Sequence, residues 1–229
     1  MAVPSAVAGL LRRPARLGDE VYSAIFARIM SLEIAPGTRI SVDAVARQLG
    51  VSQTPIREAL TRLEAEGLVV KTHLVGYSAA PQMTPAELAE LYQLRLLLEP
   101  FVARQCALTM PQTMLAHLAS LCAEMETLSQ HDGLDAYAQF AQIDMAFHDQ
   151  LAASAGNGLV VEALARLHTH VHLFRQVFDA RATGSAVAEH EAILSAIAAR
   201  DGDAAEAAMR VHIEQSRARF GGRQAPITA

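Results

Sequence analysis

The chain has 229 residues, of which 52% are hydrophobic, and a formal net charge of −5 at pH 7. This length predicts two domains with apolar cores, and the acidic balance excludes a protein that is basic throughout. No segment is long and apolar enough to span a membrane or to act as a secretory signal, so a cytoplasmic protein with no membrane partner is expected. Cys106 and Cys122 both lie in apolar helical patterns, which favours reduced core thiols over a disulfide.

Residues 1–18 are expected to form a flexible N-terminal arm. Residues 19–31 are expected to form a helix, because they carry apolar side chains at the spacing of one helix face: Val21, Ile25, Phe26 and Ile29. Pro36 and Gly37 separate this helix from the segment that follows.

The pattern in residues 36–69 predicts two short amphipathic helices joined by a tight turn. Ser41 caps the first helix, which ends at Gly50, a residue that adopts positive φ easily. Ser52 caps the second helix, and Pro55 falls in its first turn, where its missing N–H costs little. The outward side of the second helix carries small polar residues and then arginines: Gln53, Thr54, Arg57, Glu58 and Arg62.

A helix that enters the DNA major groove needs this arrangement, with small polar groups near the bases and cations near the phosphates. Residues 68–70 and 77–79 have the character of two strands joined by a turn at Gly76. The sequence therefore predicts a winged helix-turn-helix over residues 19–80 that binds double-stranded DNA. The alternative is an ordinary helical hairpin whose arginines are merely solvated.

The candidate DNA-contacting residues lie on the second helix and in the segments that flank it: Arg39, Arg47, Ser52, Gln53, Thr54, Pro55, Arg57, Arg62, Lys71 and Gly76. Charge supports this division of the chain. Residues 1–80 carry nine Lys/Arg against seven Asp/Glu, whereas residues 81–229 carry ten against seventeen. Basic surface is thus confined to the N-terminal part. The arginines of the arm could also touch DNA, or the arm could be a disordered tail.

Residues 84–220 are expected to form an all-α bundle of six helices, followed by a tail at 221–229. The first helix begins with a capping box, Thr84 to Glu87, and runs to about residue 108. The other five are expected near residues 110–130, 134–153, 158–180, 185–199 and 203–220. A second capping box, Asp203 to Glu206, is expected to open the last of them.

Four polar residues on three of these helices lie on faces that are otherwise apolar. Asp144 and His148, four residues apart, project side by side from the third helix. His190 and His212 fall on the inward lines of the fifth and sixth. A buried carboxylate needs a cation or strong donors, and a divalent metal with one oxygen and three nitrogen ligands meets that need. Zinc is the default, with nickel or manganese as alternatives. Taken singly, each residue could instead be a hydrogen-bonded core residue.

Four further residues are candidates for binding an effector. Arg95 lies on an inward apolar line, where it either binds a ligand or pairs with Glu99 four residues on. His168 and His172 have the i,i+4 spacing of ligands, and Arg175 is another candidate cation. The three histidines of this segment, His168, His170 and His172, could line an effector pocket, form a rival metal site or face solvent.

Residues 35–38, 45–46, 49–52, 54–60 and 63–69 resemble the N-terminal domain of GntR-family transcriptional regulators. The resemblance implies a homodimer on a short pseudo-palindromic operator, with contact positions at Ser52, Thr54, Pro55 and Arg57. The chain departs from the family's pattern twice. Gln53 stands where many members carry a cation, and Asp43 stands where some carry arginine, so Gln53 could read adenine instead of guanine.

The Asp144, His148, His190 and His212 pattern resembles the FCD ligand-sensing domain of the FadR subfamily, with six helices as in its VanR-type branch. Such domains often bind small organic acids. The sequence thus predicts a regulator, a repressor that is released from its operator by a small carboxylate bound near a metal. The alternatives are a metalloenzyme that uses the Asp/His₃ site to activate water, or a DNA-binding protein with no ligand.

Overall fold

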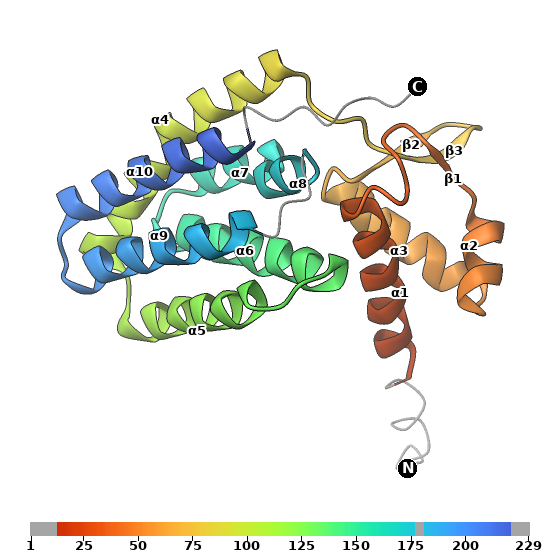
Figure 1. The fold of residues 1–229 in the computed structure, drawn as a ribbon, viewed down its shortest axis with the longest axis horizontal. Helices are drawn as coiled ribbons and strands as arrows, with labels where there is room; N and C mark the ends of the chain where they lie inside the picture. The colour runs from red at the N-terminus through yellow and green to blue at the C-terminus, as the bar shows by residue number, and fades with distance from the viewer. Residues whose placement is uncertain (1–12, 177–180, 221–229) are drawn as a thin grey trace, which may run out of the picture. The chain divides into compact units, whose positions relative to one another are not determined.

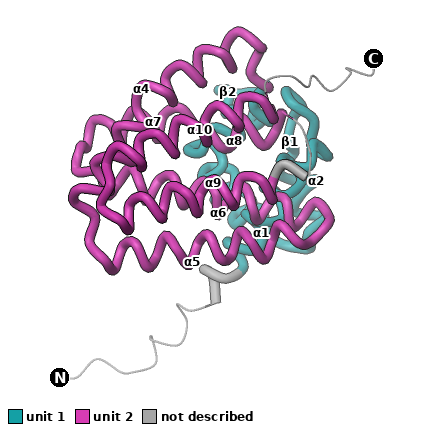
Figure 2. Tube along the Cα trace, turned by 60° about the vertical axis from the view of Figure 1, so that its left-hand side comes forward, with its two compact units in different colours: residues 1–81 teal, residues 82–229 magenta. Residues whose placement is uncertain are grey.

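The computed structural model describes residues 13–176 and 181–220, with the side chains of residues 13–16, 181 and 182 left aside. The chain divides into two compact units, Met1–Pro81 and Gln82–Ala229 (Figure 2). The tail predicted at 221–229 and residues 1–12 of the predicted arm lie outside the described residues. Residues 13–18 are helical, so the arm is shorter than expected. Pro14 sits in the first turn of that helix, where proline is well tolerated.

The first unit is a helical domain with a small sheet (Figure 1). Its elements are α1 (Arg13–Met30), β1 (Arg39–Ile40), α2 (Val42–Leu49), α3 (Gln53–Ala65), β2 (Val69–Thr72) and β3 (Gly76–Ala79). Ser41 caps α2 by accepting from the Ala44 N–H, and Gly50 ends it in the left-handed region at φ 67°. Ser52 occupies the N-cap of α3, although its side chain makes no capping bond. Ile56, Leu60 and Leu63 are fully buried, as the apolar stripe requires.

The wing has three strands in the order β1-β3-β2, all antiparallel, where two were expected. Arg39 pairs with Ser78 and Ile40 with Tyr77, so the short segment before α2 adds to the hairpin. A two-residue strand has too little periodicity to be found in the sequence. This extra strand ties the wing to the start of the helix-turn-helix.

The second unit is the expected all-α bundle. Its helices are α4 (Pro85–Thr109), α5 (Gln112–Ser129), α6 (Leu134–Ser154), α7 (Gly158–Leu167), α8 (Thr169–Phe174), α9 (Arg181–Ala198) and α10 (Gly202–Phe220). Helix α10 packs along α4 and α9, and α5 packs against α6 and α9 (Figure 1). The Thr84–Glu87 capping box is formed in full. None of the helices in the described residues has the length and apolarity to cross a bilayer.

The described part of this unit has seven helices, so the prediction of six was wrong. His168 takes a left-handed conformation, φ 46° and ψ 38°, which ends α7 and divides the helix expected at 158–180. The resemblance to the VanR-type branch was inferred from six helices, and the seven described helices remove that support. Two start points also differ from prediction. Helix α9 begins at Arg181 instead of near Ser185, and Asp201, not Asp203, caps α10 through the Ala204 N–H.

Candidate functional site

Three buried imidazoles from three helices meet inside the second unit. His148 of α6, His190 of α9 and His212 of α10 are each less than 8% exposed. His148 Nε2 lies 3.3 Å from His190 Nε2. The three rings have potential ligand atoms that all lie within 4.8 Å of one another. Each histidine lies on the apolar stripe of its helix. Packing of the three stripes against one another therefore brings the three rings into the interior of the bundle.

Two glutamates hold the outer nitrogens of these rings. Glu99 Oε2 lies 3.0 Å from His148 Nδ1, and Glu189 Oε2 lies 2.9 Å from His212 Nδ1. An imidazole that donates its Nδ1–H to a carboxylate keeps a lone pair on Nε2. The Nε2 atoms of both rings are thereby free to act as ligands, which is the arrangement found around histidine-bound metals.

Asp144 of α6 adds a carboxylate to the same cluster. Its Oδ1 lies 3.3 Å from His190 Nε2, and its Oδ2 lies 2.6 Å from His170 Nδ1. Burial alone would raise the pKa of Asp144, but the neighbouring imidazoles, His170 first among them, hold that pKa well below its usual range. Asp144, which is 4% exposed, is therefore a buried anion.

Three imidazoles of the cluster have pKa values that burial lowers, which favours their neutral form. Burial lowers the pKa of His190 to about 3 and brings the pKa of His212 well below its usual value. The pKa of His170 is also lowered, again chiefly by burial. Neutral imidazole and ionised carboxylate are the protonation states that bind a divalent metal. The donor set and its supporting carboxylates thus fit the metal that the sequence pattern predicted.

The structure brings together all four predicted metal-site residues and adds a fifth, His170. Asp144, His148 and His170 form a second group whose ligand atoms lie within 4.8 Å of one another. The sequence showed three alternating histidines in this segment, and the i,i+4 spacing drew attention to the outer two. The left-handed turn at His168 resets the helical phase, so His170 points inward instead.

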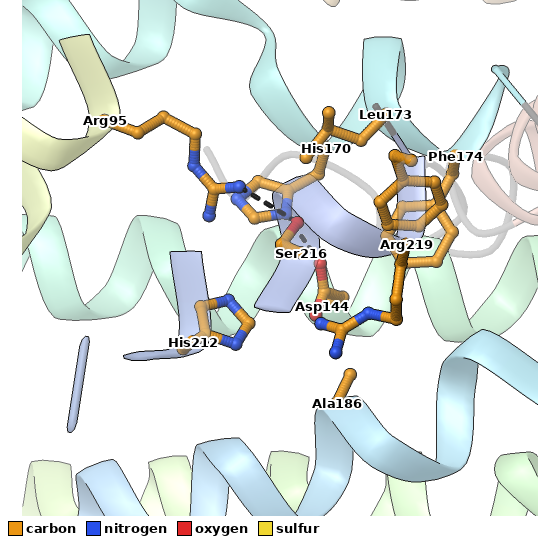
Figure 3. Close-up of a pocket in the computed structure, with 10 residues that line it drawn as sticks. Arg95, Asp144, His170, Leu173, Phe174, Ala186, His212, Ser216 and Arg219 are labelled. Atoms are coloured by element: carbon orange, nitrogen blue, oxygen red, sulfur yellow. Dashed lines mark hydrogen bonds and ion pairs between the residues drawn. The ribbon is translucent and has the colours of Figure 1, made fainter. Parts of the chain in front are cut away.

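A pocket opens beside this cluster. It is lined by Arg95, Asp144, His170, Leu173, Phe174, Ala186, His212, Ser216, Arg219 and Phe220, and its empty volume, including the part open to solvent, is about 290 Å³. Arg95 and Arg219 lie on opposite sides of the pocket, with Asp144 and Ser216 between them (Figure 3).

Arg95 pairs with Glu99, as one of the two sequence interpretations predicted, and it also lines the pocket. The Arg95 Nε donates to Glu99 Oε1 at 2.6 Å, and a second contact to Glu99 Oε2 is 3.3 Å long. The guanidinium also donates to Ser216 Oγ at 3.3 Å. Arg95 is completely buried. Its charge is thus compensated by Glu99, while its remaining donors face the pocket.

The other predicted effector residues are placed elsewhere. His168 is half-buried at the end of α7, and neither it, His172 nor Arg175 is among the residues that line this pocket. Burial and the nearby Arg175 lower the pKa of His172 to about 4. The pocket instead includes Ser216 and Arg219, which were not among the predicted effector residues. They follow His212 by one and two helical turns, a spacing that could have identified them.

The reading face of the first unit is formed by the start of α3. Gln53, Thr54 and Arg57 are exposed there. The Gln53 Nε2 donates to Asp43 Oδ1 at 2.5 Å, and the Arg57 Nη2 donates to Gln53 Oε1 at 3.2 Å. Ser52 is also exposed, and Pro55 is partly covered within the first turn.

The remaining predicted DNA contacts differ in how free they are. Arg62 donates to Asp19 Oδ1 at 2.7 Å and stacks over the Tyr22 ring at 4.1 Å, so it is directed at α1. Arg47 donates to the Asp43 carbonyl at 3.3 Å. Three of the predicted contacts are exposed on the sheet, namely Arg39, Lys71, whose ammonium lies over the Tyr77 ring, and Gly76 at φ 111°.

Two family models match the chain. The first, bacterial regulatory proteins of the gntR family, matches residues 17–77, and the FCD domain matches residues 90–215. The regulator LutR of Bacillus subtilis is 31% identical over 79% of this chain and 90% of its own length. The transcriptional repressor RspR of Escherichia coli is 27% identical, over 87% of this chain and 86% of its own.

Solved structures show the same fold. A GntR regulator from Rhodococcus sp. RHA1 aligns with a TM-score of 0.67 and 21% identity, over 92% of this chain and all of that one. Escherichia coli McbR/YncC aligns with a TM-score of 0.66 and 18% identity, over 89% of this chain and 96% of that one. The chain therefore belongs to the GntR family, as a DNA-binding transcriptional regulator with an FCD domain and not an enzyme.

Proposed function

We propose that this regulator is a repressor that binds its operator as a homodimer and is released by a small carboxylate bound beside a divalent metal. The main support is the buried Asp/His cluster, whose outer nitrogens are backed by glutamates and which adjoins a pocket with two arginines. Its relative RspR is named a repressor, which agrees with this direction of control. DNA binding itself follows from the family.

Asp144, His148, His190 and His212 would hold the metal, with His170 fixing Asp144 from behind. When bound, the metal supplies a positive centre that accepts ligand oxygens. Zinc is the default for such a nitrogen-rich donor set, with nickel or manganese as alternatives. The His190 Nδ1 is buried and has no hydrogen-bond partner in the described ranges.

The charges around the cluster favour an anionic effector once the metal is present. Two described arginines, Arg95 and Arg219, contribute positive charge. Three described carboxylates contribute negative charge: Glu99, Asp144 and Glu189. With neutral imidazoles, these groups carry one net negative charge, and a divalent ion changes that to one net positive charge. A monocarboxylate would neutralise the site.

The pocket also offers hydrogen-bond donors to such an anion. Ser216 Oγ is held between Arg95 and the Tyr92 hydroxyl, 3.1 Å away. Arg219 pairs with Glu189 through its terminal nitrogens, at 2.5 and 2.9 Å. Its Nε is a buried donor with no hydrogen-bond partner among the described residues, so it is available to a ligand. A carboxylate that bridged these groups would bind by charge-assisted hydrogen bonds.

For the homodimer we propose the outer face of α4 as the contact. Exposed apolar side chains recur on it at steps of three, four and seven residues: Leu94, Leu97, Phe101 and Leu108. Leu97 is 72% exposed, which is unusual for a leucine beside three other exposed apolar residues. Glu90 and Arg104 lie on the same stripe. An antiparallel second copy would bring the acidic end of one α4 next to the basic end of the other.

The effector would act through its different affinities for two arrangements of the dimer. A ligand in the pocket contacts α4 through Arg95 and α10 through Ser216 and Arg219. Helix α4 also carries the proposed dimer face. Effector binding would therefore shift one subunit relative to the other. The winged helix-turn-helix of each subunit (residues 19–80), here called its reading head, would move with it.

Elemental analysis of protein purified without a His-tag tests the metal, followed by thermal melts with a panel of small organic acids, before and after chelation. We expect about one divalent ion per chain, and acids that raise the melting temperature only when metal is present. In the His148→Ala/His212→Ala variant both effects should vanish. The exposed His117→Ala is the matched control. An uncharged stabilising ligand, or one that acts after full metal removal, would contradict the mechanism.

A further inference from the structure

The two positions at which the reading head departs from the family pattern are in contact with each other. Asp43 lies in the first turn of α2 and Gln53 at the start of α3, ten residues apart. The Gln53 Nε2 donates to Asp43 Oδ1 at 2.5 Å, and Gln53 Oε1 accepts from the Arg57 Nη2 at 3.2 Å. The three side chains form a hydrogen-bonded chain across the exposed face at the start of α3.

These contacts determine which way the Gln53 amide is turned. A free glutamine has three rotatable bonds and an end that can flip between two orientations. A carboxylate on one side can only accept, so it selects the NH₂ group, and a guanidinium on the other can only donate, so it selects the oxygen. Asp43 and Arg57 thus fix the amide before it meets any ligand.

The fixed amide keeps one free N–H and one free lone pair. Adenine offers the complementary pair in the major groove, an acceptor at N7 and a donor at N6, and glutamine binds both at once. Guanine offers two acceptors at the same place and leaves the amide oxygen facing another acceptor. An amide held in one orientation therefore discriminates adenine from guanine more strongly than one that can rotate.

Without its contact to Gln53, Asp43 would be unfavourable at this position. An exposed carboxylate on a DNA-facing surface repels phosphates and lowers affinity for every sequence. Its contact with Gln53 gives that charge a role in selecting the base. Arg57 balances the charge of Asp43 within the chain and retains donors for the DNA backbone.

We propose that Asp43 and Arg57 clamp Gln53, and that the clamped amide selects an adenine in each half of the operator. Asp43 acts here as a positioning residue, since it turns Gln53 without itself reading a base. The inference rests on the operator binding proposed above.

Selection from a randomised DNA duplex library with the full-length protein tests the clamp without knowledge of the operator. Wild-type protein should enrich adenine at one position in each half-site. Gln53→Ala and Asp43→Ala should both lose this preference, by about tenfold, at the same position. Asp43→Asn removes the charge and replaces the acceptor-only carboxylate by an amide that can donate as well as accept, so it should weaken the preference and bind all sequences more tightly. Glu33→Ala removes a comparable exposed carboxylate that contacts Arg28 and not Gln53, and should change nothing.

The outcomes separate this inference from the function on which it rests. If neither the wild-type protein nor any variant enriches a sequence, specific operator binding itself fails. If Asp43→Ala enriches the same bases as wild type, the clamp is wrong even though the operator is real. If Gln53→Ala keeps the adenine preference, the base is read by another residue. If Asp43→Asn keeps the full preference, an acceptor-only partner is not what orients the Gln53 amide, and the clamp is wrong.

Discussion

The two units place their polar residues in opposite environments. In the first unit, Gln53 and Arg57 are exposed on one short helix, and the apolar core beneath them is free of charge. In the second, Arg95, Glu99, Asp144 and four histidines are buried at the meeting point of several helices. An exposed polar group contributes to binding at little cost to the fold, whereas a buried one is part of the fold itself.

The same kind of substitution should therefore have different effects in the two units. A change in the reading head should affect affinity for DNA and leave stability almost unchanged. A change in the buried cluster should destabilise the bundle before any question of effector binding arises.

Glu99→Ala should destabilise the second unit by about 3–5 kcal/mol, because it leaves the fully buried Arg95 without its carboxylate. It also removes the partner of His148 Nδ1. Urea unfolding of the full chain measures the loss. Glu162→Ala, which breaks the exposed pair with Arg166, should cost less than 1 kcal/mol. Equal losses in the two variants would end the distinction between buried and exposed pairs.

Leu97→Glu should weaken the dimer by about 3 kcal/mol, or roughly a hundredfold in dissociation constant, because it places a charge in the proposed apolar contact. Analytical ultracentrifugation over a range of concentrations measures this. Leu159→Glu is the matched control, since Leu159 is 78% exposed on α7 and outside the α4 stripe. A wild-type monomer, or a dimer that survives Leu97→Glu unchanged, would place the interface elsewhere.

Acid should destabilise the metal-free second unit well before it affects the reading head. The pKa of His190 is lowered to about 3 in the folded chain, whereas an unfolded histidine has a pKa of about 6.5. As pH falls through 6.5 and on towards 3, the unfolded chain takes up a proton that the folded chain refuses, so stability falls. Between pH 7 and 5.5 the loss is about 1 kcal/mol for this histidine. Urea unfolding of chelated His190→Gln should show a smaller pH dependence than wild type, and an equal one would contradict this cause.

The reading head could be predicted from the sequence because its signals are local. A cap at Ser41, a turn at Gly50 and an apolar stripe through Ile56 lie within a few residues of one another, and each fixes the conformation of its own segment. The contact between Asp43 and Gln53 was not predicted. Both were noticed as departures, but the angle between the two helices, which sequence does not specify, decides that their side chains meet.

The bundle could be predicted only in part because its site is assembled from distant segments. The helical period placed Asp144, His148, His190 and His212 on inward faces, and they do converge. The left-handed turn at His168 could not be placed from the sequence, because residues other than glycine adopt that conformation in only about a few per cent of cases. That one residue decided which of three histidines reached the site. Glu189 was overlooked because its role depends on contacts with α10, not on its own helix.

Two arginines of the same helix should differ in their effect on DNA binding. Arg57 is exposed at the start of α3, and Arg62 is held by Asp19 and the Tyr22 ring. Arg57→Ala should weaken binding to the selected duplex by about tenfold and reduce its salt dependence by about one phosphate contact. Arg62→Ala should leave DNA affinity nearly unchanged and cost the unit less than about 1 kcal/mol of stability, since its ion pair is exposed. Fluorescence anisotropy at several salt concentrations, with thermal melts of both variants, measures the two effects. If Arg62→Ala were the more damaging to DNA binding, Arg62 would have to leave Asp19 in the complex, and the reading face would extend further along α3 than the free structure indicates.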